Sequence, residues 1–394
     1  MTKTFGPMFR FGFGIFAAVL CSAVIAQEQL KIGAIGPLSG GGTAWGIAIQ
    51  RGSQLAIDEA MKAGGVKVGG KTYEPKLVMY DDAYTAAGGR AAAERLVNAD
   101  GIKFILGPFG SGSVLGALAV TNKAPALLLS NGFAPTILKN ADKAPYNFRI
   151  TLSNVEFAPE MVKWMRAQKP ELKKAGIIHP NDATGQTVVP TLMAAYKAQG
   201  FEVWTEGYER GSKEFAPLIA RMIAQGVDLM DLNSNAPGEA GLLVKQAREA
   251  GYDKVIWQVG GPSVEEIVNV AGRYADGFIS YNIIDFEEAN AAPLVKAYRE
   301  KYGSGVMDGY VPIFYNATKV LLEAIRRAGS TTDVQKVRDS LEKLDGYDAG
   351  IYGPVVWGGM AEYGVNHQLL TKFWITEVKN GKLVTRAAIS PAKR

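Results

Sequence analysis

Short apolar runs alternate with longer, helix-like stretches through most of this 394-residue chain. The apolar runs, which we predict to be strands, lie at residues 30–35, 76–80, 104–106, 126–129, 175–179, 201–204, 227–230 and 254–257. Between them apolar residues recur at helical spacing, as at Ala48, Leu55 and Ala56. Such alternation favours parallel sheets flanked by helices, with right-handed crossovers. The strands are too many for one core, so we predict two units, with residues 146–154 passing between them.

The first 26 residues have the pattern of a cleavable secretion signal. Lys3 and Arg10 precede an apolar run over residues 11–25, and Val24 and Ala26 are small residues at the −3 and −1 positions. A run of about 15 residues is short for a bilayer span, so a membrane anchor is the less favoured alternative. Leu20 before Cys21 argues against a lipoprotein signal. We therefore predict an exported mature chain that has lost its single cysteine.

Charge and composition exclude several classes of function. The formal charge of +5 falls to +3 without Lys3 and Arg10, and such a small excess of positive charge does not indicate a nucleic-acid-binding protein. One cysteine and two histidines make a cysteine-rich or multi-histidine metal centre improbable, and we expect no metal and no cofactor.

Enzyme signatures are also missing. Gly40, Gly42 and Gly46 follow the first strand, but Asp81 is 41 residues beyond Gly40, whereas a dinucleotide fingerprint places its acid about 20 residues on. The chain has no Gly-x-Ser-x-Gly nucleophile turn, and neither histidine has an evident nucleophile partner. We therefore predict a protein that is not an enzyme.

The loops that follow the predicted strands are rich in small, hydroxyl and aromatic residues. These loops are residues 36–46, 107–113 and 130–133 in the first half, and 179–185, 233–237 and 260–263 in the second. In open α/β sheets, ligands bind beyond the carboxyl ends of the strands. Small residues allow backbone N–H groups to approach an anion, and Trp45, Phe109 and Phe133 supply flat apolar walls.

Several segments resemble one known family. They are residues 31–40 (KIGAIGPLSG), Tyr80-Asp81-Asp82, 105–108, 215–221 and 246–251. In this order they resemble the periplasmic solute-binding proteins related to the leucine/isoleucine/valine-binding protein of ABC importers, over about residues 30–357. The resemblance implies an α/β fold of two Rossmann-like lobes with parallel sheets, joined by a three-strand hinge (a type I periplasmic binding protein). Lobe 1 would comprise residues 27–150 and 281–355, and lobe 2 residues 151–280 and 356–394.

The resemblance also implies a ligand site in the cleft between the lobes. Trp45 matches an aromatic that covers the ligand, and Ser111 a serine that holds its carboxylate. Thr184 lies where amino-acid binders carry a tyrosine, and Tyr310 near an aromatic from the far side of the hinge. The predicted ligand-binding residues are Trp45, Phe109, Gly110, Ser111, Asn131, Gly132, Phe133, Thr184, Asn235, Gly261 and Tyr310.

Two departures from the family pattern bear on the ligand. Amino-acid binders hold the α-ammonium with a threonine and an acidic residue, and the matching positions here are Ala134 and Gly261. A buried ammonium without an anionic partner costs several kcal/mol. Glu265 and Glu266 follow in a helix and are expected to be solvated. We therefore predict that the ligand is a small carboxylate without an α-ammonium group, with an aromatic acid as the best candidate. The sequence alone does not show whether Arg149 or Arg210 contacts the ligand carboxylate.

Some of these residues also have a purely structural interpretation. Ser111 could serve only as the N-cap of a helix. For Asp81 and Asp82, capping of the following helix is favoured over a role in ligand binding. The alternatives in function are a binder of branched-chain or other hydrophobic amino acids, a soluble receptor that presents its ligand to a sensor, and, least favoured, a nucleotide-dependent α/β enzyme. The expected partners are the ligand and the ABC permease subunits of the inner membrane, with the protein a periplasmic monomer.

Overall fold

The computed structural model describes residues 1–4, 6, 28–139, 145–261, 263–303 and 307–391. Cys21, Val24, Ala26 and most of the predicted signal sequence lie outside the described residues.

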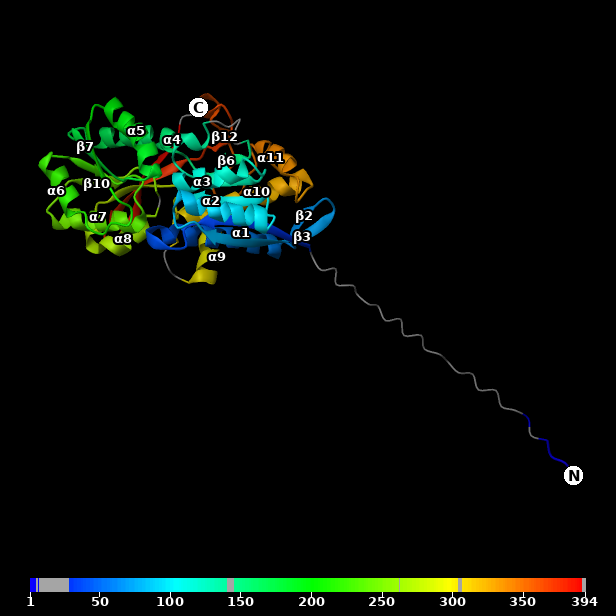
Figure 1. The fold of residues 1–394 in the computed structure, drawn as a ribbon. Coiled ribbons are helices and arrows are strands. Elements are labelled where there is room, and N and C mark those ends of the chain that lie inside the picture. The colour runs from blue at the N-terminus through cyan, green and yellow to red at the C-terminus, as the bar shows by residue number, and fades with distance from the viewer. Residues whose placement is uncertain (5, 7–27, 140–144, 262, 304–306, 392–394) are drawn as a thin grey trace.

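Two sheets form the framework of the protein (Figure 1). The first has the order β12 (Trp357–Gly358), β13 (Gln368–Leu369), β6 (Asn147–Arg149), β5 (Leu127–Asn131), β4 (Phe104–Phe109), β1 (Glu28–Gly36), β3 (Lys71–Asp81) and β2 (Val66–Val68). The second has the order β15 (Lys382–Ile389), β14 (Phe373–Lys379), β11 (Ile279–Asn282), β10 (Val255–Gln258), β9 (Leu229–Asp231), β7 (Lys174–Pro180) and β8 (Glu202–Tyr208). We call the first sheet with its helices the first lobe, and the second sheet with its helices the second lobe.

All eight strands predicted from apolar runs are present, as β1, β3, β4, β5, β7, β8, β9 and β10. The central ones pair in parallel, and β4 and β5 are buried along their whole length. A strand covered on both faces must be continuously apolar, which is why the sequence revealed these strands. The sheets are not wholly parallel, because β2, β12, β14 and β15 pair antiparallel at the edges.

Helices cover both faces of each sheet. Those of the first lobe are α1 (Thr43–Lys62), α2 (Ala86–Glu94), α3 (Ser111–Thr121), α9 (Ala292–Tyr302), α10 (Tyr310–Ala328) and α11 (Val334–Glu342), with the short α12 (Met360–Tyr363) between β12 and β13. Those of the second lobe are α4 (Asn154–Gln168), α5 (Ala183–Ala198), α6 (Ala216–Ala224), α7 (Pro237–Glu249) and α8 (Val264–Ala271). In the first lobe α1 packs on α10, and α2 on α3; in the second, α4 packs on α5, and α7 on α8.

The close packing of α1 on α10 depends on a glycine. A Cβ on Gly52 would lie 2.3 Å from the carbonyl oxygen of Val311, so any side chain there would push the two helices apart. This contact fixes the start of α10, including Tyr310, against the helix that begins with Thr43 and carries Trp45.

The chain passes between the sheets three times: after β6, after β11, and between β13 and β14. Two lobe boundaries predicted from the sequence differ from the sheet membership. Tyr281 and Asn282 still belong to β11 of the second sheet, and residues 357–369 return β12 and β13 to the first sheet before the last crossing. Two-residue strands carry no periodicity, so the sequence could not reveal β12 and β13.

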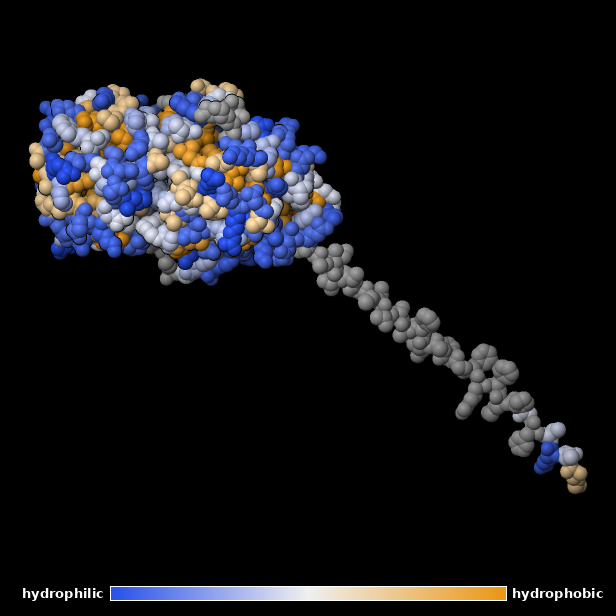
Figure 2. Space-filling view, in the orientation of Figure 1, coloured by the Kyte–Doolittle hydropathy of each residue, from blue (hydrophilic) through white to orange (hydrophobic). Residues whose placement is uncertain are grey.

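On the face shown in Figure 2, hydrophilic residues predominate and apolar ones are scattered between them. Within the described part of the chain, we find no helix with the length and apolar character that a membrane crossing requires.

Candidate functional site: a pocket between the lobes

A small pocket lies between the two lobes. It is lined by Trp45, Tyr84, Phe109, Gly110, Asn131, Gly132, Phe133, Thr184, Ser234, Asn235, Gly260, Gly261 and Tyr310. Ten of the eleven residues predicted from the sequence therefore meet at one place, and Ser111 is the exception. Their role in binding stays a prediction.

The first-lobe side of the pocket is built at the carboxyl ends of neighbouring strands, as expected for such sheets. Trp45 follows β1, Tyr84 follows β3, and Phe109 and Asn131 end β4 and β5. Asp81 ties two of these loops together, because its carboxylate accepts hydrogen bonds from the Leu38 N–H (2.8 Å) and the Ser39 hydroxyl (2.7 Å). Asp81 thus organises loops, while Thr85 supplies the N-cap of α2 that was expected from Asp81 or Asp82.

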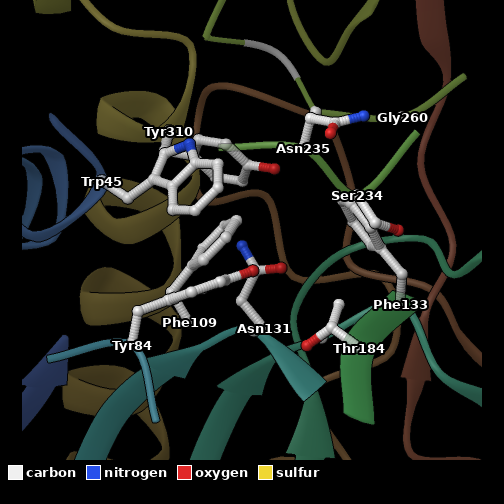
Figure 3. A pocket seen from close by; sticks show the side chains of 13 residues that line it. Trp45, Tyr84, Phe109, Asn131, Phe133, Thr184, Ser234, Asn235, Gly260 and Tyr310 are labelled. Carbon is white, nitrogen blue, oxygen red and sulfur yellow. The ribbon is translucent and has the colours of Figure 1, made fainter. Parts of the chain in front are cut away.

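Aromatic side chains form one wall of the pocket (Figure 3). The ring of Trp45 stacks on that of Phe109, with centroids 4.3 Å apart and planes at 28°. Tyr310 meets Phe109 edge to face at 4.6 Å, and Tyr84 lies 5.0 Å from Trp45. Because Trp45 and Phe109 cover each other, a ligand ring would contact the outer surface of this stack and would not lie between the two.

Tyr84 is the main pocket residue that sequence reasoning missed. It reaches the pocket because Ala83 and Tyr84 both adopt positive φ angles, of 47° and 58°, which are uncommon for residues with a side chain. Gly110 makes room for it, since a Cβ there would lie 2.4 Å from the Tyr84 ring. The signal available in the sequence was its position just beyond the Asp81-Asp82 strand end.

Ser234 and Gly260 were also missed, although both lie in strand-end loops that the sequence singled out. On this second-lobe side, Asn235 is held by its own lobe: its Nδ2 donates to the Ile178 carbonyl (2.7 Å), and its Oδ1 accepts from the Tyr208 hydroxyl. Thr184, at the start of α5, accepts a hydrogen bond from the Gly112 N–H across the cleft (3.4 Å).

Two buried polar groups in the pocket wall lack a partner among the described residues. Asn131 accepts from the Thr151 hydroxyl through Oδ1 (3.0 Å), which leaves its Nδ2 without an acceptor. The Tyr310 hydroxyl is likewise unpaired, and burial raises its pKa well above the usual value, so it stays protonated. Unpaired buried donors are costly unless a ligand satisfies them.

Ser111 lies beneath the pocket and does not line it. Its side chain is fully buried, and its Oγ accepts a hydrogen bond from the Ala134 N–H (3.0 Å). It therefore holds the 131–134 loop onto the start of α3. The first turn of α3 has no side-chain cap, so its N–H groups favour a negative charge at this end of the pocket.

No side chain that lines the pocket in the described part of the chain carries a charge. Arg210 stacks on Tyr84 at 4.6 Å across the cleft, but its charge is paired with Asp182 (2.5 Å) and Glu239 (3.2 Å). Gly261 and the buried Ala134 offer nothing acidic.

Glu265 and Glu266 correct one expectation, because both are half-buried instead of solvated. The Oε2 of Glu265 has no partner among the described residues, and burial beside Asp308 raises the pKa of Glu265 well above the usual value. It faces a separate hollow lined also by Arg51, Glu266 and Asp308, and it does not line the pocket between the lobes.

Over the described residues, no group of three or more histidine, cysteine, aspartate or glutamate side chains is arranged to hold a metal ion. The site thus combines apolar walls with hydrogen-bond donors, which is the composition of a pocket that holds a small molecule.

Comparison with known proteins agrees with this geometry. A family model described as periplasmic binding protein matches residues 29–382. The leucine-, isoleucine-, valine-, threonine- and alanine-binding protein of Pseudomonas aeruginosa is 28% identical over 347 residues, covering 86% of this chain and 87% of the relative.

Solved structures share the fold. A leucine-binding protein from Thermotoga maritima superposes with a TM-score of 0.81 at 21% identity, covering 92% of this chain and 99% of the other. A solute-binding protein of an ABC transporter from R. palustris, in complex with benzoate, gives a TM-score of 0.77 at 21% identity, with 92% and 97% covered.

This protein is therefore an α/β binding protein of the type I architecture, with a pocket between its two lobes. It belongs to the periplasmic binding protein family, whose members bind their ligands without acting on them as enzymes.

Proposed function

We propose that this protein is the extracytoplasmic solute-binding subunit of an ABC importer, and that it captures a small carboxylate without an α-ammonium group, best an aromatic acid. The observation that carries the proposal is the pocket lining: four clustered aromatic rings, unpaired donors on Asn131 and Tyr310, and no acidic side chain among the described lining residues.

The donors suit an anion. The N–H groups at the start of α3, the Asn131 Nδ2 and the Tyr310 hydroxyl are all able to donate a hydrogen bond to a ligand, and donors of this kind favour a carboxylate. The rings of Trp45, Phe109 and Tyr310 supply a flat apolar surface for the rest of the ligand.

An α-ammonium would lack an anionic partner in this pocket. Glu265 lies outside it, and the acids Asp182 and Glu239 are already paired with Arg210. Burying an ammonium here would cost several kcal/mol that a simple carboxylate avoids. The fold neighbour that binds benzoate supports this choice of ligand.

A hydrophobic amino acid is the second candidate. It is favoured by the names of the curated relatives at 28% identity, which include leucine, isoleucine and valine binders. Backbone carbonyls would then have to hold the ammonium, because the described pocket residues offer no carboxylate.

Closure of the lobes is the proposed mechanism. Contacts made by both lobes on the ligand exist in the closed form alone, so the ligand shifts the population towards closure by its differential affinity. The closed protein would then be recognised by the permease subunits at the periplasmic face of the inner membrane. A receptor that presents the same ligand to a sensor shares this mechanism.

A thermal-shift screen of the mature protein tests the proposal. A ligand present at about 1,000 times its dissociation constant stabilises the folded protein by about 4 kcal/mol. We expect the midpoint to rise with benzoate and hydroxybenzoates, and to stay unchanged with leucine, valine and short aliphatic acids. Stabilisation by leucine alone would establish the amino-acid candidate instead.

A further inference from the structure

Arg149 is a fully buried arginine directly beneath the pocket loop. It is the last residue of β6, and its side chain has no exposed surface. One guanidinium nitrogen, Nη1, donates to the carbonyls of Ala134 (2.8 Å) and Gly132 (3.3 Å). Gly132 itself lines the pocket, so Arg149 lies one layer of backbone away from the ligand space.

The charge of Arg149 has no counter-ion in the described part of the chain. No ion pair within 4.0 Å involves its guanidinium there, and its Nη2 has no hydrogen-bond partner among those residues. The face of the Tyr363 ring lies 4.8 Å from its Cζ. Beyond that ring, Glu156 is held by Ser153 and by the Tyr363 hydroxyl, and does not reach Arg149.

The guanidinium of Arg149 is a buried positive charge. A buried charge without a counter-ion is unfavourable, and an anion close by relieves the penalty. Glu156 lies on the far side of the Tyr363 ring, and the described pocket residues carry no negative charge, so a bound ligand would bring an anion to the pocket side of Arg149.

Arg149 also orients the loop. In a trans peptide the C=O and N–H groups point in opposite directions. Because the Gly132 carbonyl points to Arg149, the N–H of Phe133 points away from it, and this N–H has no acceptor among the described residues. Hydrogen bonds also connect Arg149 with Asn131 in the pocket wall. Gln368 accepts from Arg149 Nε (2.5 Å) and donates to the Thr151 carbonyl (2.6 Å). The Thr151 hydroxyl in turn donates to Asn131 and orients its side chain.

We propose that Arg149 is a specificity-determining positioning residue: its buried charge, acting through the 132–134 loop, makes the pocket prefer an anionic head group over a neutral one of the same shape. This inference rests on the proposed function, because it assumes that a carboxylate occupies the pocket.

The test compares benzoate with benzamide, which has nearly the same shape and no charge. Dissociation constants are measured by calorimetry for the wild type and for Arg149→Gln and Arg149→Met, which are neutral. Arg149→Lys retains the charge. Gln368→Leu is the matched control, since it breaks the same hydrogen-bond network and leaves the charge in place.

We expect the wild type to prefer benzoate, and the neutral variants to lose this preference by about tenfold or more, with benzamide affinity changed by less than about threefold. Arg149→Lys should keep the preference, and Gln368→Leu should weaken the binding of both ligands to the same extent.

An unchanged ratio of the benzoate and benzamide dissociation constants in the neutral variants would overturn the proposal. The proposal would also be overturned if both neutral variants failed to fold while Arg149→Lys folded, because the charge would then be required for folding and not for ligand preference. If the wild type binds leucine and neither benzoate nor another carboxylate, the proposed function itself has failed.

Discussion

The indole N–H of Trp45 donates a hydrogen bond of 2.8 Å to the hydroxyl of Ser263, and this buried contact joins the two lobes beside the pocket. Trp45 belongs to α1 of the first lobe, and Ser263 precedes α8 of the second. The Ser263 hydroxyl in turn donates to the carboxylate of Asp308, which also accepts from the Tyr310 N–H (2.8 Å). Ser263 thus contacts two side chains of the first lobe. If the lobes close on the ligand as proposed, we expect these contacts to be present in the closed form only.

Removing this contact should weaken ligand binding without unfolding either lobe. Ser263→Ala and Trp45→Phe each delete one hydrogen bond, and we expect a loss of affinity of about three- to tenfold. Trp45→Ala also removes part of the aromatic wall and should cost at least about tenfold. Calorimetry measures the affinity and thermal melting measures the stability. Ser212→Ala is the control, because it deletes an exposed hydrogen bond to the Glu209 carbonyl away from the pocket. An unaltered dissociation constant in Ser263→Ala would show that the contact does not contribute to closure.

Ligand affinity should fall as the pH rises from about 5.5 to about 7.5. Burial is the largest cause that raises the pKa of Asp308, to about 6, with Glu266 adding to it, whereas Ser263 and the Tyr310 N–H lower it. In the open form we expect a value close to the usual one of about 3.9. The closed form therefore holds more protons than the open form from about pH 4 to just above pH 6. Raising the pH from about 5.5 to about 7.5 removes the last part of this difference and lowers the affinity by about fourfold.

Asp308→Asn is the control for this pH dependence and should give a flat profile over the same range. Asp82 and Asp231 have pKa values raised to about 6 and about 7, but each is bonded within its own lobe, so closure should not shift them. The same slope in Asp308→Asn would assign the effect to another group, such as Glu265.

Gly110→Ala should abolish binding, because the new Cβ would lie 2.4 Å from the Tyr84 ring and the backbone has a φ of 88°. The displaced Tyr84 would also lose its stacking with Arg210 across the cleft. Gly112→Ala is the matched control: it lies two residues on, its φ is ordinary, and its Cβ would meet nothing closer than 3.7 Å. If Gly110→Ala and Gly112→Ala bound the ligand with equal affinity, Tyr84 would have no role in ligand binding.

Asn131→Asp should weaken benzoate binding by about 100-fold. The aspartate keeps the acceptor for Thr151 and replaces the unpaired Nδ2 donor by a negatively charged oxygen facing the ligand carboxylate. Asn122→Asp adds the same charge at the exposed end of α3 and should have little effect. Calorimetry would contradict this geometry if Asn131→Asp bound benzoate as well as the wild type does.

The sequence was sufficient for the parts of the molecule that repeat a strong pattern. Strands such as β4 and β5 were predictable because both faces are buried, and the loops after them carry Phe109 and Asn131 to the pocket. Tyr84 was not predictable, because its position depends on two positive φ angles at residues that rarely adopt them. The partners of Ser263 and Arg149 were equally hidden, since they come from residues 218 and 219 positions away in the chain. Long-range pairing of this kind is set by the fold and has no local signature.

The central claim is that this pocket holds a carboxylate without an α-ammonium, and titration calorimetry of the mature protein with benzoate and with leucine tests it most directly. We predict saturable binding of benzoate or a hydroxylated benzoate, with a dissociation constant in the range of about a micromolar, and no heat of binding with leucine. Micromolar binding of leucine, with benzoate and its relatives inert, would contradict the account.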